Sequence, residues 1–258
     1  MAVLEHASDW VFLRGLVRES AHWDDFPRDF SRTIRGARVY PMDLPGNGMH
    51  WRLQSFLTIS DTAEYVRREF FALRGPEHTR PLYLFSISLG SMVAIEWMHL
   101  HPGEVAGAVL VNTSSRTCSP FFRRLSWRVW PHLLYIFTAR DPFARERSIL
   151  KLTARSSADN AALLHARVRT SQKHPVRRRN ALRQLCAAAR YRPPPKQPPV
   201  PMLLLNSLGD RLVDPACSDA LARVWGAALH IHPAAGHDLP LDDPGWTLDT
   251  VAAWLRRS

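Results

Sequence analysis

The sequence predicts an α/β fold in which a doubly wound, mostly parallel six-stranded sheet carries an inserted helical cap. Three observations predict it. Six short apolar runs bounded by turn residues are typical of strands that are buried on both faces. Helical patterns separate most of these runs, which indicates parallel strands joined by right-handed crossovers. The 258 residues, 46% of them hydrophobic, are enough for one domain with a sizeable core.

The predicted strands and helices alternate along the chain. Strands are expected at residues 10–14, 39–42, 82–85, 108–111, 202–205 and 229–231, and the second of them ends in a turn at 43–48. Helices are expected at 61–73, with Ser60 as the N-cap candidate, and at 91–100, 218–224 and 248–255. This order predicts a sheet with helices on both faces.

A long segment between the fourth and fifth predicted strands breaks the alternation. Residues 117–199 have a helical pattern and many aromatic residues in their first part, and they end in the proline-rich stretch 192–199. A helical insertion at this position is expected to cover the crevice at the carboxyl ends of the strands. The sequence therefore predicts a core formed by residues 1–116 and 200–258, with a cap formed by residues 117–199.

The positive charge of the chain is concentrated in the predicted cap. The chain has a formal net charge of +11, and residues 117–199 contain 18 Lys and Arg against 3 Asp and Glu. A basic face of this kind attracts an acidic partner by long-range steering. A competing interpretation is a GC-rich coding sequence, because 31 of the 34 basic residues are arginine.

Several classes of site and location are not expected. Cys118, Cys186 and Cys217 are odd in number and widely spaced, so we expect ordinary thiols and neither a disulfide framework nor a zinc site. No motif indicates a cofactor or another metal. The chain begins without a signal-peptide pattern and has no apolar run of the ~20 residues that a membrane span needs. A cytoplasmic protein without a membrane span is expected.

Ser88 is the candidate nucleophile. It is the central residue of Ser86-Ile87-Ser88-Leu89-Gly90, between a predicted strand and a predicted helix. This is the context of a nucleophile elbow, a sharp turn that lifts the serine hydroxyl above the sheet. The turn requires small residues two positions before and after the serine. Gly90 meets this requirement, and Ser86 replaces the usual glycine with another small residue.

His237 is the candidate general base. A serine hydroxyl is a poor nucleophile at neutral pH and needs an adjacent base. The chain has 12 histidines, and His237 differs from the others by its place in a glycine-bounded loop after the last predicted strand. From that loop it can reach back over the edge of the sheet.

Asp210 is the candidate acid that orients the imidazole. It lies in the loop after the fifth predicted strand. Asp214 is its rival, but it directly precedes Pro215 and is expected to cap the next helix. The loop after the fourth predicted strand, which begins at Asn112, has no carboxylate. The chain order Ser, Asp, His is that of one triad fold and differs from the order in the others.

Together these segments resemble the α/β-hydrolase superfamily, in its capped, esterase-like branch, over nearly the full chain. The segments that carry the resemblance are Phe12-Leu13-Arg14-Gly15-Leu16, Asp43 to Gly48, Ser86 to Gly90, Gly209-Asp210-Arg211-Leu212-Val213 and Gly236-His237-Asp238. The resemblance implies an oxyanion hole formed by the backbone amides of Leu16 and Leu89.

Two features depart from this family. The family usually has histidine before the glycine of the first segment, where this chain has Arg14, and that histidine braces the loop. Only about nine residues precede the first predicted strand. The resemblance therefore implies a sheet that lacks the two leading strands common in the family.

The predicted function is hydrolysis of a carboxylic ester or thioester through an acyl-enzyme on Ser88. A serine nucleophile argues against the dehalogenases of this fold, which use aspartate. The aromatic residues of the cap favour an apolar acyl group. Similar enzymes act on acyl groups held by an acidic acyl carrier protein, and candidate docking residues here are Arg123, Arg124, Arg128, Arg177, Arg178 and Arg179.

Three alternatives remain open at this stage. The same triad can serve a lyase or a carbon–carbon bond hydrolase. Some relatives use the pocket as a non-catalytic small-molecule receptor. Nucleic-acid binding is the least favoured, because the arginines lack a recognition motif.

Overall fold

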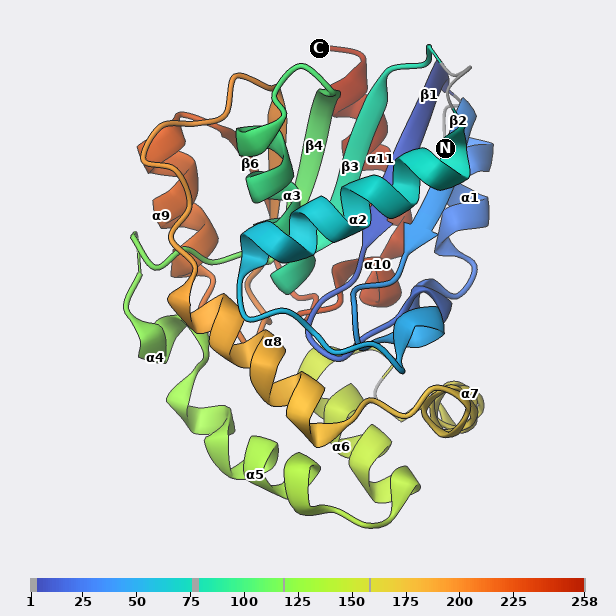
Figure 1. Ribbon diagram of the computed structural model, residues 1–258, viewed down its shortest axis with the longest axis vertical. Helices are drawn as coiled ribbons and strands as arrows, with labels where there is room; N and C mark the ends of the chain where they lie inside the picture. The colour runs from blue at the N-terminus through green and yellow to red at the C-terminus, as the bar shows by residue number, and fades with distance from the viewer. Residues whose placement is uncertain (1–3, 76–78, 118, 158, 258) are drawn as a thin grey trace.

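The computed structural model describes residues 4–75, 79–117, 119–157 and 159–257. Its centre is a six-stranded, all-parallel sheet with the order β2-β1-β3-β4-β5-β6 (Figure 1). The strands are β1 (Leu4–Leu13), β2 (Ile34–Met42), β3 (Leu82–Ile87), β4 (Val105–Val111), β5 (Met202–Ser207) and β6 (Ala228–His232). The predicted fold class is confirmed.

Helices cover both faces of the sheet. They include α1 (Phe26–Thr33), α2 (Ile59–Arg74), α3 (Leu89–Leu100), α9 (Ala216–Trp225), α10 (Leu239–Asp242) and α11 (Pro244–Leu255), with short 3-10 turns at Ser20–Trp23 and Gly48–His50. The four helices expected outside the cap are all present, and each begins two to four residues earlier than the sequence pattern indicates. Within the described residues, no helix is long and apolar enough to cross a membrane.

Side-chain alternation along the strands divides the core into two layers. On β1, Val11 and Leu13 pack with α2 and α3, whereas Trp10 and Phe12 pack with α1 and α11. All four side chains are fully buried, because each face of the sheet is covered by helices. Continuous apolar runs therefore mark strands here, since a strand covered on both faces has no side open to water.

The sequence pattern misplaced the start of β1 and missed α1. β1 begins at Leu4, and its first part pairs only with β2, because pairing with β3 starts at Asp9. This part contains several polar residues and no continuous apolar run, so its sequence did not indicate a strand, and the expected start at residue 10 is wrong. α1 was overlooked because its apolar face is narrow, with Phe26 and Phe30 as its buried aromatic residues.

A group of helices lies between β4 and β5 in the chain and at the carboxyl ends of the strands (Figure 1). They are α4 (Phe121–Arg124), the 3-10 turn η3 (Trp127–Val129), α5 (Trp130–Thr138), α6 (Pro142–Thr153), α7 (Ala161–Lys173) and α8 (Arg178–Arg190). We call residues 117–199 the cap. Its boundaries as a separate domain, at 116/117 and 199/200, stay a prediction.

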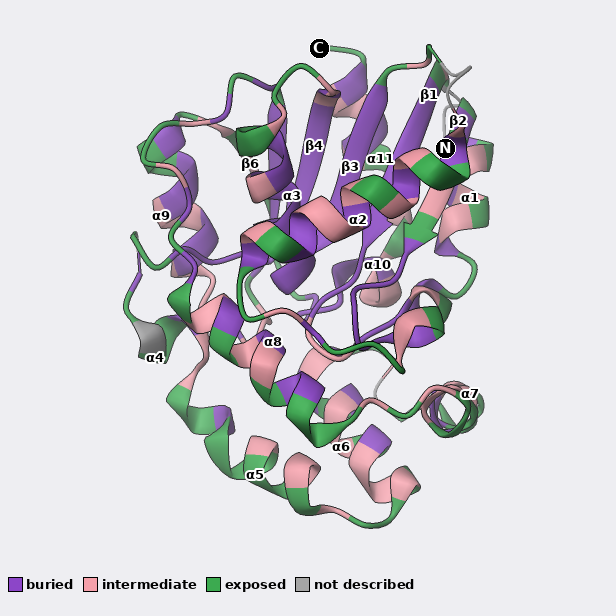
Figure 2. Ribbon diagram, viewed as in Figure 1, coloured by how far each residue is buried: buried purple, intermediate pink, exposed green. Residues whose placement is uncertain are grey.

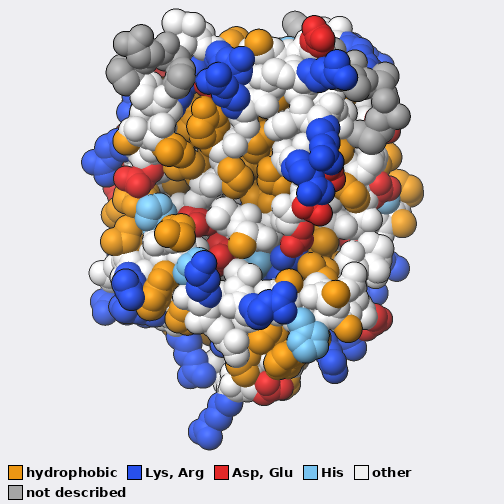
Figure 3. All heavy atoms as spheres, turned by 90° about the vertical axis from the view of Figure 1, so that its right-hand side faces the viewer, with side chains coloured by type: hydrophobic (Ala, Val, Ile, Leu, Met, Phe, Trp, Pro, Cys, Tyr) orange, Lys and Arg blue, Asp and Glu red, His pale blue; other side chains and the backbone are white. Residues whose placement is uncertain are grey.

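The charge of the cap is visible on the molecular surface. On the face drawn in Figure 3, blue Lys and Arg side chains project from the lower end, where the cap lies, and are separated by orange hydrophobic groups. The basic side chains on this face do not form one continuous basic patch. The arrangement of the individual arginines therefore matters more than their number.

Candidate active site

Ser88 lies in a strained turn between β3 and α3. Its backbone has φ 57° and ψ −116°, a region that costs a non-glycine residue about 1–3 kcal/mol. The Ser88 amide donates a hydrogen bond of 2.9 Å to the Val111 carbonyl, which ties the turn to the end of β4. The side chain is half-buried and lines a cavity beneath the cap. This is the geometry of the predicted nucleophile elbow.

The neighbours of Ser88 are small because backbone crosses close to the turn. A Cβ atom on Gly90 would lie 2.6 Å from the Leu13 carbonyl oxygen and 2.7 Å from that of Arg14. Ser86 is fully buried, and its hydroxyl is 3.2 Å from the Val109 carbonyl oxygen, to which it donates. The serine therefore fits where the family usually has glycine, since its hydroxyl has a partner.

His237 and Asp210 form a buried pair. Nδ1 of His237 lies 2.7 Å from Oδ2 of Asp210, and the other oxygen of Asp210 accepts the Leu212 and Val213 amides at 2.8 and 3.0 Å. This arrangement places the Nδ1 proton toward the carboxylate and leaves Nε2 available as an acceptor. The rival Asp214 accepts the Ala216 amide at the start of α9 at 2.9 Å, although the N-cap residue of that helix is Pro215.

Ser88 and His237 line one cavity, together with Leu16 and Leu89, the predicted oxyanion residues. Asp210 lies behind His237, with its side chain only 1% exposed. Within the described residues the Ser88 hydroxyl makes no hydrogen bond to His237. Such contacts are often long in unliganded sites and shorten when substrate binds.

Asn112 holds the loop that carries His237. Its side-chain amide donates to the carbonyl oxygens of His237 at 2.9 Å and Gly236 at 3.2 Å, and its Oδ1 accepts the Ser207 amide at 2.9 Å. The loop at Asn112 has no carboxylate, so its residue types do not indicate a role in the site. The contact joins residues more than 120 positions apart, so no local pattern could reveal it.

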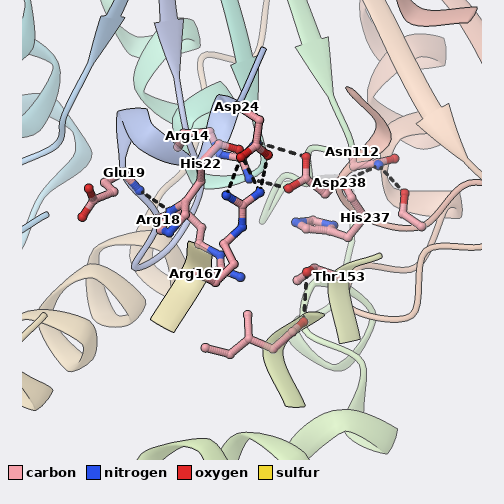
Figure 4. Close-up of polar contacts among 12 residues, drawn as sticks. Arg14, Arg18, Glu19, His22, Asp24, Asn112, Thr153, Arg167, His237 and Asp238 are labelled. Carbon is pink, nitrogen blue, oxygen red and sulfur yellow. Dashed lines mark hydrogen bonds and ion pairs between the residues drawn. The ribbon is translucent and has the colours of Figure 1, made fainter. Parts of the chain in front are cut away.

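Arg14 forms a buried ion pair with Asp238, the residue after His237 (Figure 4). The two terminal guanidinium nitrogens of Arg14, Nη1 and Nη2, each donate to one carboxylate oxygen of Asp238. Arg14 is 4% exposed and Asp238 is 5% exposed. Burial favours the neutral carboxyl, but Arg14, with Arg167 and Arg18, lowers the pKa of Asp238 below its ordinary value. The guanidinium also lies 4.6 Å from the centre of the Trp23 ring. Arg14 thus links the loop that precedes Leu16 to the loop that carries His237.

Two further ion pairs join the cap to the core next to this site, of which Arg18–Glu146 is buried and Arg167–Asp24 has an exposed carboxylate. Arg18 donates to Glu146 of α6 at 3.1 Å, and Arg167 of α7 donates to Asp24 at 2.8 Å. Burial lowers the pKa of Arg18 and raises that of Glu19. A neutral partner is also present, because Gln184 of α8 accepts the Val17 amide at 3.0 Å. The cap therefore braces the loop that contains Leu16.

The cavity is mostly apolar toward the cap. It has a volume of about 240 Å³ and extends from Ser88 and His237 to the inner side of the cap. The apolar cap residues along it include Leu125, Leu133, Ile136, Phe137, Ile149 and Leu185. A space of this size and lining suits a small apolar group beside the serine.

The six predicted docking arginines do not form one patch. Arg177, Arg178 and Arg179 are exposed at the start of α8, whereas Arg123 and Arg128 are exposed near its far end. The 13 residues of α8 span about 20 Å, which separates the two groups.

Arg124 differs from the other five docking candidates. It is 7% exposed and donates to the Ala188 and Ala189 carbonyls, so in this structure it is unavailable to a docked protein.

The described residues contain no cluster of His, Cys, Asp and Glu suited to a metal ion. Cys186 and Cys217 are free thiols, and Cys118 lies outside the described residues. Burial raises the pKa of the Cys217 thiol to about 11, so this thiol is protonated at neutral pH.

A parallel sheet with a serine at the β3–α3 turn and a His–Asp pair beyond the later strands defines a hydrolase of the α/β class. The chain belongs to the alpha/beta hydrolase family, whose model matches residues 10–250. No curated protein matches the chain significantly.

Solved structures with the same fold include enzymes of several activities. The esterase RhEst1 from Rhodococcus sp. ECU1013 is 18% identical with a TM-score of 0.75, covering 98% of this chain and 93% of that one. The RedJ thioesterase of the prodiginine biosynthetic pathway in Streptomyces coelicolor is 16% identical with a TM-score of 0.67, covering 98% and 94%. A meta-cleavage product hydrolase from Pseudomonas fluorescens IP01 is 15% identical with a TM-score of 0.79, covering 98% and 92%. At these identities the likeness extends to the fold alone.

Proposed function

We propose that the protein is a serine hydrolase that cleaves a carboxylic ester or thioester through an acyl-enzyme on Ser88. The observation that carries the proposal is the shared cavity. Ser88, at a positive φ, and His237, 2.7 Å from Asp210, both face an apolar space under the cap. An esterase, a thioesterase and a meta-cleavage product hydrolase share this fold, so the reaction class is proposed from the site itself.

In the proposed reaction the Ser88 hydroxyl attacks the acyl carbonyl carbon while Nε2 of His237 takes its proton. The amides of Leu16 and Leu89 stabilise the oxyanion, each contributing about 3–4 kcal/mol. The bond to the alcohol or thiol then breaks, and His237 returns the proton to this leaving group. A water molecule, deprotonated by His237, attacks the acyl-serine and releases the carboxylic acid and free Ser88.

The lining of the cavity supports an apolar acyl group. Leu133, Ile136 and Phe137 of α5 lie along it, and most of the other cap residues that line it are also apolar. A short or medium apolar chain would bury its surface against α5, which stabilises binding by about 25 cal/mol per Å². Esters with charged acyl groups should therefore be poorer substrates than apolar ones.

Mass spectrometry of the intact protein after fluorophosphonate treatment tests the proposal. One adduct should form on the unmodified protein and map to Ser88, and none should form on Ser88→Ala. Ser91→Ala is the matched control, because Ser91 is fully buried three residues further on and outside the cavity lining. Turnover without any adduct would instead favour a lyase or carbon–carbon bond hydrolase. A folded protein with neither adduct nor turnover would favour a receptor.

Delivery of the acyl group by an acidic acyl carrier protein is a finer form of the proposal. The start of α8 supports it, because Arg177, Arg178 and Arg179 are exposed and Arg178 lines the cavity. Replacing the three by glutamate should lower the rate with a carrier-bound ester and leave the rate with a free p-nitrophenyl ester of similar length much less affected. Equal effects on both esters would contradict carrier docking at this edge.

A further inference from the structure

Helix α5 is mostly apolar, with His132 and Thr138 as its polar residues, yet none of its residues is buried. It carries the sequence WPHLLYIFT over Trp130–Thr138. Figure 2 shows the contrast, with α5 in pink and green at the outer edge of the cap while the sheet strands are largely purple. A group of exposed large apolar side chains on one surface marks a site of contact with a protein or a membrane. The exposed apolar surface of α5 therefore indicates a partner.

The two sides of α5 have different surroundings. On the inner side, Leu133, Ile136 and Phe137 line the cavity that contains Ser88. On the outer side, Leu134 is 67% exposed and Tyr135 is 47% exposed. We use the name outer ridge for the exposed apolar side chains on and next to α5, which are Phe122, Trp127, Trp130, Leu134 and Tyr135. A single helix thus separates the outer ridge from the candidate active site.

Basic residues accompany the outer ridge. A groove of about 690 Å³ next to it is lined by Phe122 and Trp127, and by four basic residues, Arg123, Arg128, Lys151 and Arg211. Its acidic members are already engaged, because Asp210 is bonded to His237 and Asp214 lies 3.8 Å from Arg123. The groove therefore has an excess of positive charge next to exposed tryptophan.

We propose that the outer ridge and its basic groove dock on an anionic phospholipid surface. Tryptophan and tyrosine are favoured at the level of lipid headgroups, leucine reaches the acyl chains, and arginine and lysine pair with lipid phosphates. Helix α5 lies at the outer end of the molecule (Figure 1), where a deformable surface can reach it. An acidic protein would satisfy the arginines but would leave Leu134 and Trp127 to find apolar partners of matching shape.

Docking in this orientation would bring the cavity next to the lipid. The inner side of α5 lies on the cavity, so displacing this one helix would open a path from the membrane to Ser88. The substrate class that follows is an amphiphilic ester with an apolar acyl chain that resides in the membrane. This substrate assignment rests on the proposed function, whereas the docking itself does not.

Co-sedimentation with vesicles tests the docking without turnover. The probes are vesicles of equal parts phosphatidylglycerol and phosphatidylcholine, and vesicles of phosphatidylcholine alone, with Ser88→Ala protein at low salt. We expect the protein to bind the anionic vesicles. Binding should weaken at about 0.5 M salt, because that concentration screens exposed charges. The pair Trp127→Ser and Leu134→Ser should weaken it about tenfold or more, as should Arg123→Glu with Arg128→Glu.

Matched controls keep the result interpretable. Leu73→Ser on α2 and Arg35→Glu on β2 remove an exposed leucine and an exposed arginine far from the ridge, and should bind like the parent protein. Circular dichroism and melting temperature confirm that each variant is folded.

Three outcomes would overturn the proposal. They are no binding of the parent to anionic vesicles, equal binding by the ridge variant, and capture of an acidic carrier protein that depends on Arg123 and Arg128 in place of vesicle binding. Fluorophosphonate labelling without lipid is independent of these outcomes, so failure of docking and failure of the proposed function can be told apart.

Discussion

Replacing Asp238 by alanine leaves the Arg14 guanidinium buried without its counterion. Arg14 is 4% exposed, and no other carboxylate in the described part of the chain bonds to it. Arg18 and Arg167 add positive charge nearby, since both act on the Asp238 carboxylate. Breaking a buried pair from one side costs about 3–5 kcal/mol, because the remaining charge has lost its solvent and its partner. Asp238→Ala should lower the free energy of unfolding by that amount.

The double variant Arg14→Met with Asp238→Leu separates this cause from simple loss of packing. It removes both charges and keeps similar side-chain volumes, so it should cost less than either single variant. Urea unfolding at pH 7 compares the double variant with the single variants Arg14→Met and Asp238→Leu, which close the cycle. At a slope of about 3 kcal/mol per M, each single variant should move the midpoint down by about 1–1.7 M.

The double variant also tests the role of the pair in holding the site. Its kcat should fall by about tenfold to a hundredfold with little change in KM, because the His237 loop loses its tie to the loop before Leu16. The reasoning would be refuted if the two single effects simply added in the double variant. It would also be refuted if Asp238→Ala cost less than about 1 kcal/mol, since the pair would then be better solvated than its burial indicates.

Other predictions concern the triad, the elbow and pH. Asp210→Asn should lower kcat about 10⁴-fold while circular dichroism stays unchanged, because the His237 tautomer is no longer held. Gly90→Ala should lower the melting temperature and destabilise the fold by about 1–3 kcal/mol, since its Cβ would meet two carbonyl oxygens; Gly103→Ala, with no atom near its Cβ, is the control. Burial lowers the pKa of His22 well below 6.5. Below about pH 6.5 the unfolded chain therefore binds a proton at His22 that the folded chain does not bind, and the free energy of unfolding should fall as the pH drops. His22→Asn keeps an acceptor for the Glu19 amide and should flatten that part of the urea stability profile, whereas the loss below pH 4 should remain, since the lowered pKa of Asp238 acts there.

Local patterns in the chain were sufficient for most elements of the core. Strands such as β3 are buried on both faces, so residues 82–85 form an uninterrupted apolar run, and turn residues mark where the strands end. β1 shows the limit of this approach, because its first half joins the edge of the sheet with polar residues that no apolar run announces. The candidate site followed from the same logic, since Ser88 lies directly after a strand and Asp210 and His237 lie in loops that follow strands.

The contacts that support the site could not be predicted in this way. Arg14 was recognised as a departure from the family, but its partner Asp238 is 224 positions away. Asn112 was set aside, yet it holds the His237 loop. Arg124 is buried against α8, whereas the other candidate docking arginines are exposed. The residue type is the same in both cases, so the sequence could not distinguish them.

The sequence by itself determined the class of fold, the succession of most strands and helices along the chain and the positions at which reactive side chains emerge. These depend on short-range periodicity and on the rule that parallel strands end at one edge of the sheet. Only the tertiary structure decided which charges are paired, which arginines are exposed and which sides of α5 face the cavity and the solvent. Such features arise from contacts between distant segments, whose energies depend on burial and distance in three dimensions and leave no pattern along the chain.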